Sequence, residues 1–117
     1  MSDVVDLIDR YCDVWCEPDA QTRASKLEAV WADGATYTDP TVHAAGAQEL
    51  LAHIARVQSR RPGSQVARTS AVDVHHGIGR FYWKATAADG TVLREGVDIA
   101  FFSADGAKIE RIIGFFD

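Results

Sequence analysis

Residues 78–103, with the sequence IGRFYWKATAADGTVLREGVDIAFFS, decide the fold of this chain. Two runs rich in β-branched and aromatic residues, about 78–87 and 91–103, flank the dipeptide Asp89-Gly90. An Asp-Gly pair between such runs is a strong signal for a tight β-hairpin. The stretch therefore predicts two antiparallel strands joined by a two-residue turn.

The length of this turn sets which side chains face one another across the hairpin. A two-residue turn places Lys84 opposite Glu95, a favourable charge pair, and Phe81 opposite Asp98. A three-residue loop would instead place Lys84 opposite another cation, and Arg80 opposite Asp98. We favour the first register, which also gathers an apolar face on the first strand: Phe81, Trp83, Ala85 and Ala87.

The rest of the chain divides into a helical first half and an extended second half. Apolar residues recur at helical spacing over about 3–16, 20–32 and 46–60, with a short strand expected at 35–38. Further strands are expected at about 64–71, 72–76 and 108–116. Helices followed by an antiparallel meander predict an α+β fold, with three N-terminal helices packed on a curved, mostly antiparallel sheet.

The composition narrows the class of protein. At 117 residues, 47% hydrophobic and 25% charged, the chain fits one globular domain spanning 1–117. Its net charge of −5 and its lack of a basic stripe argue against nucleic-acid binding. No apolar run approaches the roughly 20 residues of a membrane span. The acidic N-terminus lacks a signal-peptide pattern, so we expect a cytoplasmic protein.

Cys12 and Cys16 stand four residues apart in the first predicted helix. Side chains at this spacing share a face but point in parallel, which is a poor geometry for a disulfide. No further Cys or His stands at metal-ligand spacing from them. We therefore expect two reduced thiols and no metal site. Nothing in the sequence calls for an organic cofactor, and none is expected.

Two further stretches carry a family resemblance. One is Trp31-Ala-Asp-Gly-Ala-Thr-Tyr-Thr-Asp39-Pro40; the other is Val97-Asp-Ile-Ala-Phe-Phe102 with the closing strand Ile-Glu-Arg-Ile-Ile-Gly-Phe-Phe after it. Their order and spacing resemble the NTF2-like superfamily, which includes SnoaL-like polyketide cyclases and ketosteroid isomerases. The resemblance spans the whole chain and implies a cone-shaped α+β domain.

The resemblance also implies roles for three residues. Asp39 falls where ketosteroid isomerases keep a proton-transferring carboxylate, and Tyr11 where they keep a phenol that hydrogen-bonds the substrate oxyanion. Asp98 falls where they keep a second, protonated carboxylic acid. SnoaL-like cyclases similarly use an acidic residue, sometimes with a histidine. Proton transfer beside a carbonyl requires a base and donors to the oxygen that gains charge, and these three residues supply both.

Each of the three residues also has a purely structural interpretation. Asp39 precedes Pro40, and aspartate there commonly opens a turn by bonding nearby backbone. Asp98 could form a cross-strand ion pair with Arg80, which would lower its pKa. Tyr11 could be an ordinary core tyrosine. A carboxyl group inside an apolar strand is rare without a reason, however, and this favours a pocket role for Asp98.

Other side chains are expected to complete the pocket. Apolar residues should line it and bind substrate: Trp15, Trp31, Leu51, Ile54, Phe81 and Trp83. His43 follows Asp39 by four residues and could assist proton transfer. His75 and His76 are adjacent in a strand, so only one of them could face the pocket. His53 is expected to lie between helix faces, in solvent.

Strand 108–116 is apolar on both of its faces. We expect Ile109, Ile113 and Phe115 on one face, and Ile112 and Phe116 on the other. One face can pack against the helices, while the other would leave an apolar patch that a small chain tends to cover. A homodimer through the sheet is therefore expected. NTF2-like domains, which this chain resembles, commonly form such dimers.

These observations favour a cofactor-free enzyme that uses Asp39 or Asp98 as general acid or base on a small apolar molecule. The substrate would be polycyclic or aromatic and carry a carbonyl, and the reaction would be an isomerisation or an aldol-type cyclisation. A non-catalytic ligand-binding or dimerisation module on the same fold is the alternative. A limonene-type epoxide hydrolase is a further one, and its Asp-Arg-Asp arrangement would need the register that sets Arg80 beside Asp98.

Overall fold

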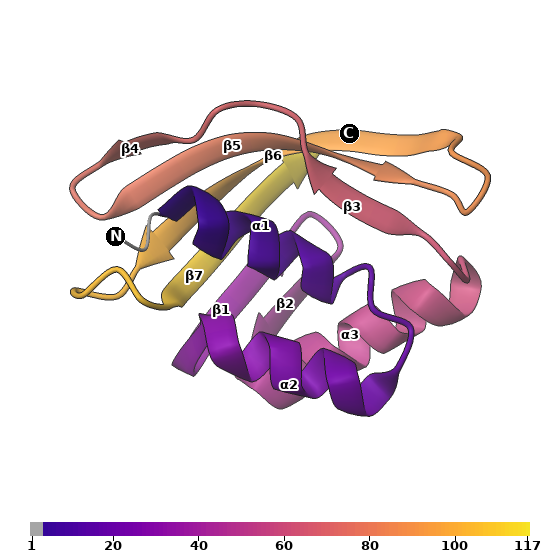
Figure 1. Ribbon diagram of the computed structural model, residues 1–117, viewed down its shortest axis with the longest axis horizontal. Coiled ribbons are helices and arrows are strands. Elements are labelled where there is room, and N and C mark those ends of the chain that lie inside the picture. The colour runs from indigo at the N-terminus through magenta and orange to yellow at the C-terminus, as the bar shows by residue number, and fades with distance from the viewer. Residues whose placement is uncertain (1–3) are drawn as a thin grey trace.

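The computed structural model describes residues 4–117, which form three helices and seven strands. The helices are α1 (Val4–Val14), α2 (Ala20–Val30) and α3 (Ala47–Arg60). The strands are β1 (Trp31–Asp39), β2 (Val42–Ala45), β3 (Gln65–Arg68), β4 (Asp73–His75), β5 (Ile78–Thr86), β6 (Val92–Phe102) and β7 (Ile109–Phe116). Figure 1 shows the helices gathered on one face of a curved sheet. This confirms the predicted α+β architecture.

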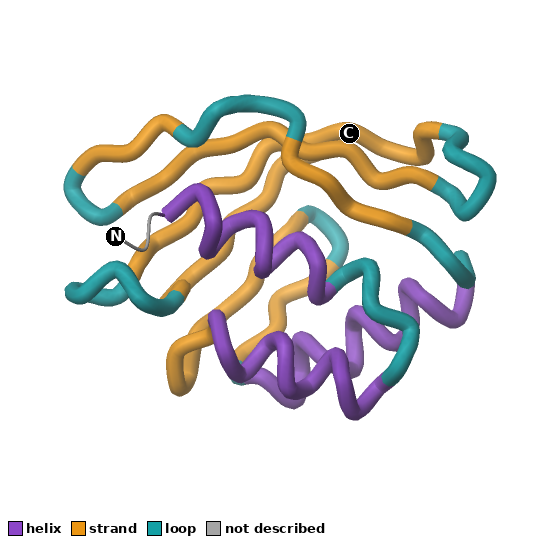
Figure 2. The backbone as a smooth tube through the Cα atoms, viewed as in Figure 1, coloured by secondary structure: helices purple, strands orange, loops and turns teal. Residues whose placement is uncertain are grey.

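The strands of residues 4–117 form one sheet in the order β2-β1-β7-β6-β5-β3, with β4 also paired to β5. Neighbouring strands are antiparallel except for β1 and β7, which run parallel. Figure 2 shows how β1 and β2, from the first half of the chain, extend the sheet built by the second half. The parallel pairing places the end of β1 beside the middle of the sheet, and this positions the site described below.

The β5–β6 hairpin has the predicted register but not the predicted turn. Lys84 lies opposite Glu95 and Phe81 lies opposite Asp98, as expected. The amide of Ala87 donates to the carbonyl of Thr91 at 2.8 Å, however, so the loop between them holds three residues. A bulge between Ala85 and Thr86 then shifts the pairing by one residue. The bulge, and not a two-residue turn, therefore sets the register of the inner face.

A second bulge corrects the prediction for the faces of β7. Ile109 was expected beside Ile113 and Phe115, but it is fully buried on the inner face with Ile112. The cause is an irregularity in the β6–β7 pairing, which places an extra residue between Ile109 and Arg111. Phe115 remains on the outer face, where 57% of its surface is exposed.

The boundary between α2 and β1 also differs from the prediction. α2 ends at Val30, and Trp31 has extended backbone and begins β1, so the helix is shorter and the strand longer than expected. β1 is irregular between Trp31 and Thr36. The strand β2 was not predicted; it pairs with β1 across a tight turn at Pro40. The predicted start of the first helix at residue 3 lies outside the described residues.

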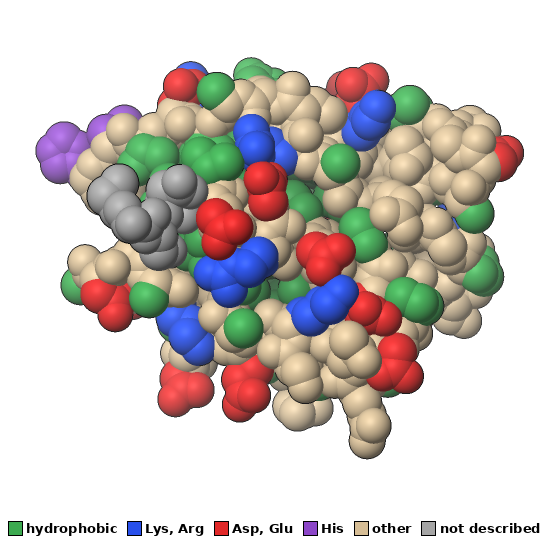
Figure 3. Space-filling view, in the orientation of Figure 1, with side chains coloured by type: hydrophobic (Ala, Val, Ile, Leu, Met, Phe, Trp, Pro, Cys, Tyr) green, Lys and Arg blue, Asp and Glu red, His purple; other side chains and the backbone are tan. Residues whose placement is uncertain are grey.

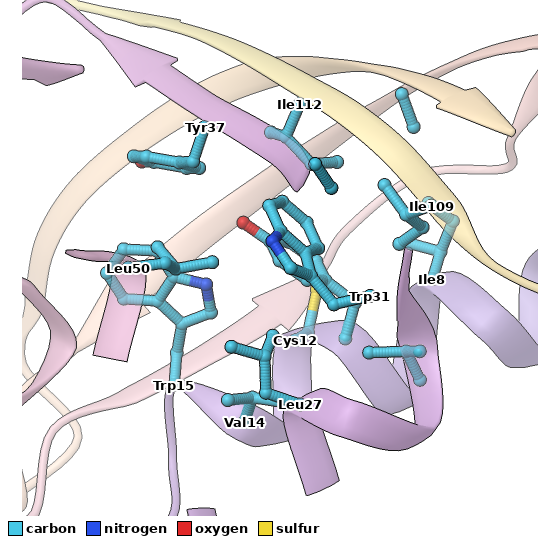
Figure 4. Packing of buried hydrophobic residues seen from close by; sticks show 14 of the residues in the cluster. Ile8, Cys12, Val14, Trp15, Leu27, Trp31, Tyr37, Leu50, Ile109 and Ile112 are labelled. Carbon is cyan, nitrogen blue, oxygen red and sulfur yellow. The ribbon is translucent and has the colours of Figure 1, made fainter. Parts of the chain in front are cut away.

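The core fills the space between the helices and the inner face of the sheet. Its largest fully shielded aliphatic and aromatic side chains include Leu7, Ile8, Leu27, Leu50, Ile54, Phe81, Ile109 and Ile112. Figure 4 shows Trp31 of β1 beside Cys12 of α1 and Leu27 of α2. Charged side chains of both signs cover the outer surfaces of α1 and α2 instead (Figure 3). Cys12 and Cys16 are free thiols, as expected.

Within the described part of the chain, none of the helices has both the length and the apolar character that crossing a membrane would require.

Candidate active site

A cavity of about 450 Å³ lies between the helices and the inner face of the sheet. Pockets of this size hold small organic molecules. The polar lining residues include Tyr11, Tyr37, Asp39, His53 and Asp98. Trp15, which follows α1 directly, and Trp83 of β5 form part of the wall. The cavity therefore combines aromatic walls with a few polar groups.

Asp98 lies on the inner face of β6 with only 6% of its surface exposed. The indole Nε1 of Trp83 donates to Asp98 Oδ1 at 2.8 Å, and this is the only hydrogen bond of the Asp98 side chain within residues 4–117. Burial raises the pKa of Asp98 from 3.8 to about 7; the Trp83 bond opposes this rise and the charge of Asp39 adds to it. Asp98 is thus a carboxylic acid that keeps its proton up to about neutral pH.

Asp39 ends β1 and lines the same cavity. Its Oδ1 accepts hydrogen bonds from the amide and the hydroxyl of Thr41, both at 2.7 Å, and from the amide of Val42 at 3.1 Å. Its Oδ2 accepts one from the hydroxyl of Tyr37 at 2.6 Å. Asp39 therefore does serve the turn at Pro40, as its structural interpretation predicted. The same carboxylate faces the cavity together with Tyr37.

Gly114 of β7 lies between the two aspartates. Asp98 pairs with Gly114 across β6 and β7. The parallel pairing of Thr38 with Ile113 brings Asp39 to the other side of Gly114. A Cβ atom on Gly114 would lie 2.7 Å from Asp98 Oδ1 and 3.7 Å from the Cβ of Asp39. The missing side chain therefore gives both carboxyl groups room on one face of the sheet.

Tyr11 lines the cavity from α1, and its ring stacks on Trp31 with 5.8 Å between the ring centroids. Its hydroxyl is buried and has no hydrogen-bond partner among residues 4–117. Burial, and then the negative charge of Asp98, raise the pKa of Tyr11 well above 10.0, and the side chain of Trp15 opposes this rise. A buried hydroxyl without a partner is unusual. An oxygen atom of a bound molecule would satisfy it.

Tyr37 and His53 are cavity residues that the sequence analysis missed. Tyr37 stands two residues before Asp39 and so shares its face of β1. Its ring stacks on His53 with 6.0 Å between centroids. His53 was expected in solvent, but only 8% of it is exposed and burial lowers its pKa. The signal was present in the sequence, because His53 follows Leu50 by three residues and precedes Val57 by four.

Gln58 of α3 holds the aromatic wall in place. Its Nε2 donates to the carbonyl of Trp15 at 2.6 Å and to that of Ser64 at 3.3 Å. These bonds satisfy buried backbone oxygens and tie α3 to the end of α1. The ring of Trp15 then meets Tyr37 at 5.4 Å and His53 at 5.7 Å between centroids. One aromatic cluster from α1, β1 and α3 therefore forms this side of the cavity.

Solved structures resemble the chain, although no protein-family model and no curated protein sequence matches it. A SnoaL-like family protein from Agrobacterium tumefaciens, provisionally described as an isomerase, is 26% identical with a TM-score of 0.90, over 100% of this chain and 99% of that one. An NTF2-like protein of unknown function from an Exiguobacterium species is 21% identical with a TM-score of 0.73, over 95% and 98%. A SnoaL-like protein of unknown function from Burkholderia thailandensis is 14% identical with a TM-score of 0.73, over 97% and 94%.

The chain has the fold of the NTF2-like superfamily and resembles its SnoaL-like group. The sequence resemblance had predicted both the superfamily and the group. The functions of two of these three neighbours are unknown, so the likeness supports the SnoaL-like fold and not a particular reaction.

Four residues predicted to line the SnoaL-like cavity do not line it. Trp31, Ile54 and Phe81 are buried in the core, and Leu51 packs against the core half-buried. The cavity lies at the Trp83 end of β5, so Phe81, two residues away, belongs to the packed interior. On α3 the preceding residue, His53, takes the cavity position that Ile54 was expected to hold. Trp31 was predicted to lie on the apolar face of the second helix, but it has extended backbone and begins β1.

His43 and His75 are exposed and do not line the cavity. His43 pairs with Thr38, whose neighbours along β1 point inward, so alternation places it on the outer face. Its Nδ1 lies 2.7 Å from the Thr38 hydroxyl. His75 lies at the β4–β5 turn, where its Nδ1 is 3.2 Å from that of His76. Neither histidine can take part in chemistry inside the cavity from these positions.

Arg80 lies on the outer face of β5, where its guanidinium is 2.7 Å from Asp73 Oδ2. Phe81, and not Arg80, lies opposite Asp98. The Asp-Arg-Asp arrangement that a limonene-type epoxide hydrolase would need is therefore not formed by Arg80 and Asp98. Among residues 4–117, His, Cys, Asp and Glu form no group of three or more that could hold a metal ion.

Proposed function

We propose that this SnoaL-like protein is a cofactor-free cytoplasmic enzyme that moves a proton beside the carbonyl of an apolar substrate. The observation that carries the proposal is the presence of Asp98 and Tyr11 in the same cavity. One is a buried carboxyl group with a pKa of about 7, and the other is a buried hydroxyl without a partner among residues 4–117. Both line one cavity. Two neutral donors in a site shielded from water suit an oxygen atom that gains negative charge.

Asp39 is the base in this proposal. Its Oδ2 takes a proton from the carbon beside the carbonyl, and the electron pair of that C–H bond moves to form the enolate. The enolate oxygen accepts hydrogen bonds from Asp98 and Tyr11. In an isomerisation, Asp39 returns the proton to another carbon of the conjugated system. In an aldol-type cyclisation, the enolate carbon bonds to a second carbonyl carbon, and the proton from Asp39 goes to that carbonyl's oxygen.

The different surroundings of the two aspartates support this division of roles. Asp98 accepts one hydrogen bond and is nearly fully buried, so its protonated form is favoured. Asp39 accepts four hydrogen bonds from Tyr37, Thr41 and Val42, which hold its carboxyl group in place at the cavity. Two acids in such different environments commonly divide into an acid and a base.

The test is exchange of carbon-bound hydrogen, which needs no knowledge of the natural substrate. α-Tetralone, a bicyclic ketone, is incubated in D2O with the protein, and loss of the proton signal beside its carbonyl is followed by NMR. The wild type should accelerate the exchange over buffer, and Asp39→Asn should lose about 100-fold of that acceleration or more. Asp33→Asn, an exposed residue of the same strand, is the matched control and should behave as wild type. Exchange at the buffer rate would overturn the proposal.

A non-catalytic ligand-binding module is the second candidate, and the turn around Asp39 favours it. The hydrogen bonds from Thr41 and Val42 explain Asp39 without any chemistry. A binding module would take up a phenol such as 2-naphthol, measured by tryptophan fluorescence, without promoting exchange. The enzyme would do both. Its affinity for the phenol would rise in Asp39→Asn, because a phenolate mimics the enolate oxygen and the substitution removes a nearby negative charge.

We further propose that the outer face of the sheet packs against a second copy of the chain. Tyr82, Val97 and Phe115 lie side by side across β5, β6 and β7. Tyr82 and Phe115 are 54% and 57% exposed. An apolar patch of this kind commonly marks an interface. Sedimentation equilibrium should give twice the chain mass, and a single-chain mass at micromolar concentration would contradict the proposal.

A further inference from the structure

We infer that the substrate carries a carboxylate, which three arginines at the mouth of the cavity receive: Arg60, Arg61 and Arg94. This inference rests on the proposed function, because it names the class of molecule that the same cavity takes. All three side chains line the cavity, and all three residues are exposed. They therefore lie where the cavity meets solvent, whereas Asp98 and Tyr11 lie inside.

The three guanidinium groups lack carboxylate partners. Within residues 4–117, no Asp or Glu oxygen lies within 4.0 Å of any of them. Other arginines of this part of the chain also lack a carboxylate partner, namely Arg23, Arg56 and Arg111, but these do not line the cavity. The protein is acidic overall, with a net charge of −5. Three uncompensated cations at one opening of an acidic protein make a local anion-binding surface.

The fold brings these arginines together from two separate segments. Arg60 and Arg61 stand at the end of α3, and Arg94 stands on β6 just after the β5–β6 turn. The two segments touch, because a Cβ atom on Gly63 would lie 2.9 Å from the Cβ of Ala88. The C-terminal end of the α3 dipole would account for Arg60 and Arg61 alone, but not for a third arginine from the sheet.

Arg94 is also held in place over the cavity wall. Its guanidinium carbon lies 4.1 Å from the centre of the Phe116 ring. That ring meets Trp83 edge-on at 6.0 Å between centroids, and Trp83 in turn bonds Asp98. A guanidinium stacked on an aromatic face loses less freedom when it binds an anion. The chain of contacts runs from the mouth to the buried acid.

The charges of the cavity set the orientation of such a substrate. The inner end holds the proposed base Asp39, whose negative charge would repel the carboxylate of the substrate, and the neutral donors Asp98 and Tyr11, which suit a carbonyl oxygen. The outer end holds the arginines, whose planar groups bind carboxylates in a bidentate manner. The carbonyl therefore enters first and the carboxylate remains at the mouth.

The experiment compares two ligands of one shape: 6-hydroxy-2-naphthoate and 6-hydroxy-2-naphthamide, each titrated by calorimetry. Both present a phenol to the inner end, and only the first carries a charge at the other. Wild type should bind the carboxylate about tenfold more tightly than the amide, since a charge-assisted hydrogen bond contributes this much. The triple variant Arg60→Gln/Arg61→Gln/Arg94→Gln should lose the preference. Arg56→Gln, which removes one unpaired charge from α3 outside the cavity lining, should keep it.

The outcomes separate this inference from the proposed function. Equal affinity for the two ligands would overturn the inference and leave the exchange assay with α-tetralone untouched. Failure of both ligands to bind would also overturn it. If Arg56→Gln lost the carboxylate preference as fully as the triple variant, net charge alone would explain the preference, and this too would overturn the inference. A carboxylate preference without hydrogen exchange would support the anion site while contradicting the enzyme.

Discussion

Replacing Asp98 by Asn should remove a large part of the pH dependence of folding stability. In the folded protein the pKa of Asp98 is raised to about 7, from an ordinary value of 3.8. Between these values the folded chain holds a proton that the unfolded chain has released. The stability that this group contributes is therefore complete below about pH 3.8 and is lost as the pH rises towards 7. The total loss is about 4 kcal/mol, at 1.36 kcal/mol per pH unit.

Over an accessible range the effect remains large. Between pH 5 and pH 8 the wild type should lose about 2.5 kcal/mol through Asp98 alone, and Asp98→Asn should not. Asparagine keeps an oxygen acceptor for the indole of Trp83, so the hydrogen bond at the site is preserved. The titrating groups that do not interact with Asp98, including the buried His53, are common to both proteins and cancel in the difference.

The assay is urea unfolding followed by tryptophan fluorescence at pH 5, 6, 7 and 8. The free energy of unfolding of Asp98→Asn, relative to wild type, should rise by about 2.5 kcal/mol across this series. Asp33→Asn, at an exposed site, should follow the wild-type curve at every pH. A difference between Asp98→Asn and wild type that stays constant from pH 5 to pH 8 would refute the argument, because Asp98 would then already be ionised at pH 5.

Three further changes have expected outcomes. Tyr37→Phe removes the donor 2.6 Å from Asp39 Oδ2 and should lower the free energy of unfolding by about 1 kcal/mol in urea; an unchanged midpoint would speak against that bond. Gly114→Ala places a Cβ 2.7 Å from Asp98 Oδ1 and should cost about 1–3 kcal/mol in the same measurement, with wild-type stability as the contrary result. Phe115→Glu should convert a dimer to a monomer in sedimentation equilibrium, and a persisting dimer would place the interface elsewhere.

The sequence predicted the layers of the fold because each layer has its own periodicity. The Asp89-Gly90 pair between two β-rich runs predicted the hairpin, and the opposite charges of Lys84 and Glu95 predicted its register. The predictions were wrong for local details that depend on a single extra residue in a loop or strand. The loop after Ala87 holds three residues and a bulge restores the pairing, and no side-chain pattern distinguishes that from a two-residue turn. A bulge similarly turned Ile109 inward.

The candidate site could be predicted where a polar residue stands within an otherwise apolar stretch of sequence. Asp98 stands out as an acid within an apolar strand, and the structure places it on the cavity wall. The burial of His53 was not predicted although its helical spacing was visible, because a polar side chain on a helix is more often exposed than buried. The arginines at the mouth could not be inferred at all. Arg61 and Arg94 stand 33 positions apart in the chain, and only the folded sheet brings their segments together.

The parallel pairing of β1 with β7 has a kinetic consequence. Asp39 lies at the end of β1 and Asp98 lies on β6, and β7, the last strand within residues 4–117, lies between them. Contacts between segments so far apart in sequence form late, because the entropy of closing a long loop opposes them. The carboxyl pair should therefore assemble only when the final strand docks, and a folding intermediate with native helices and a native β5–β6 hairpin would still lack the site.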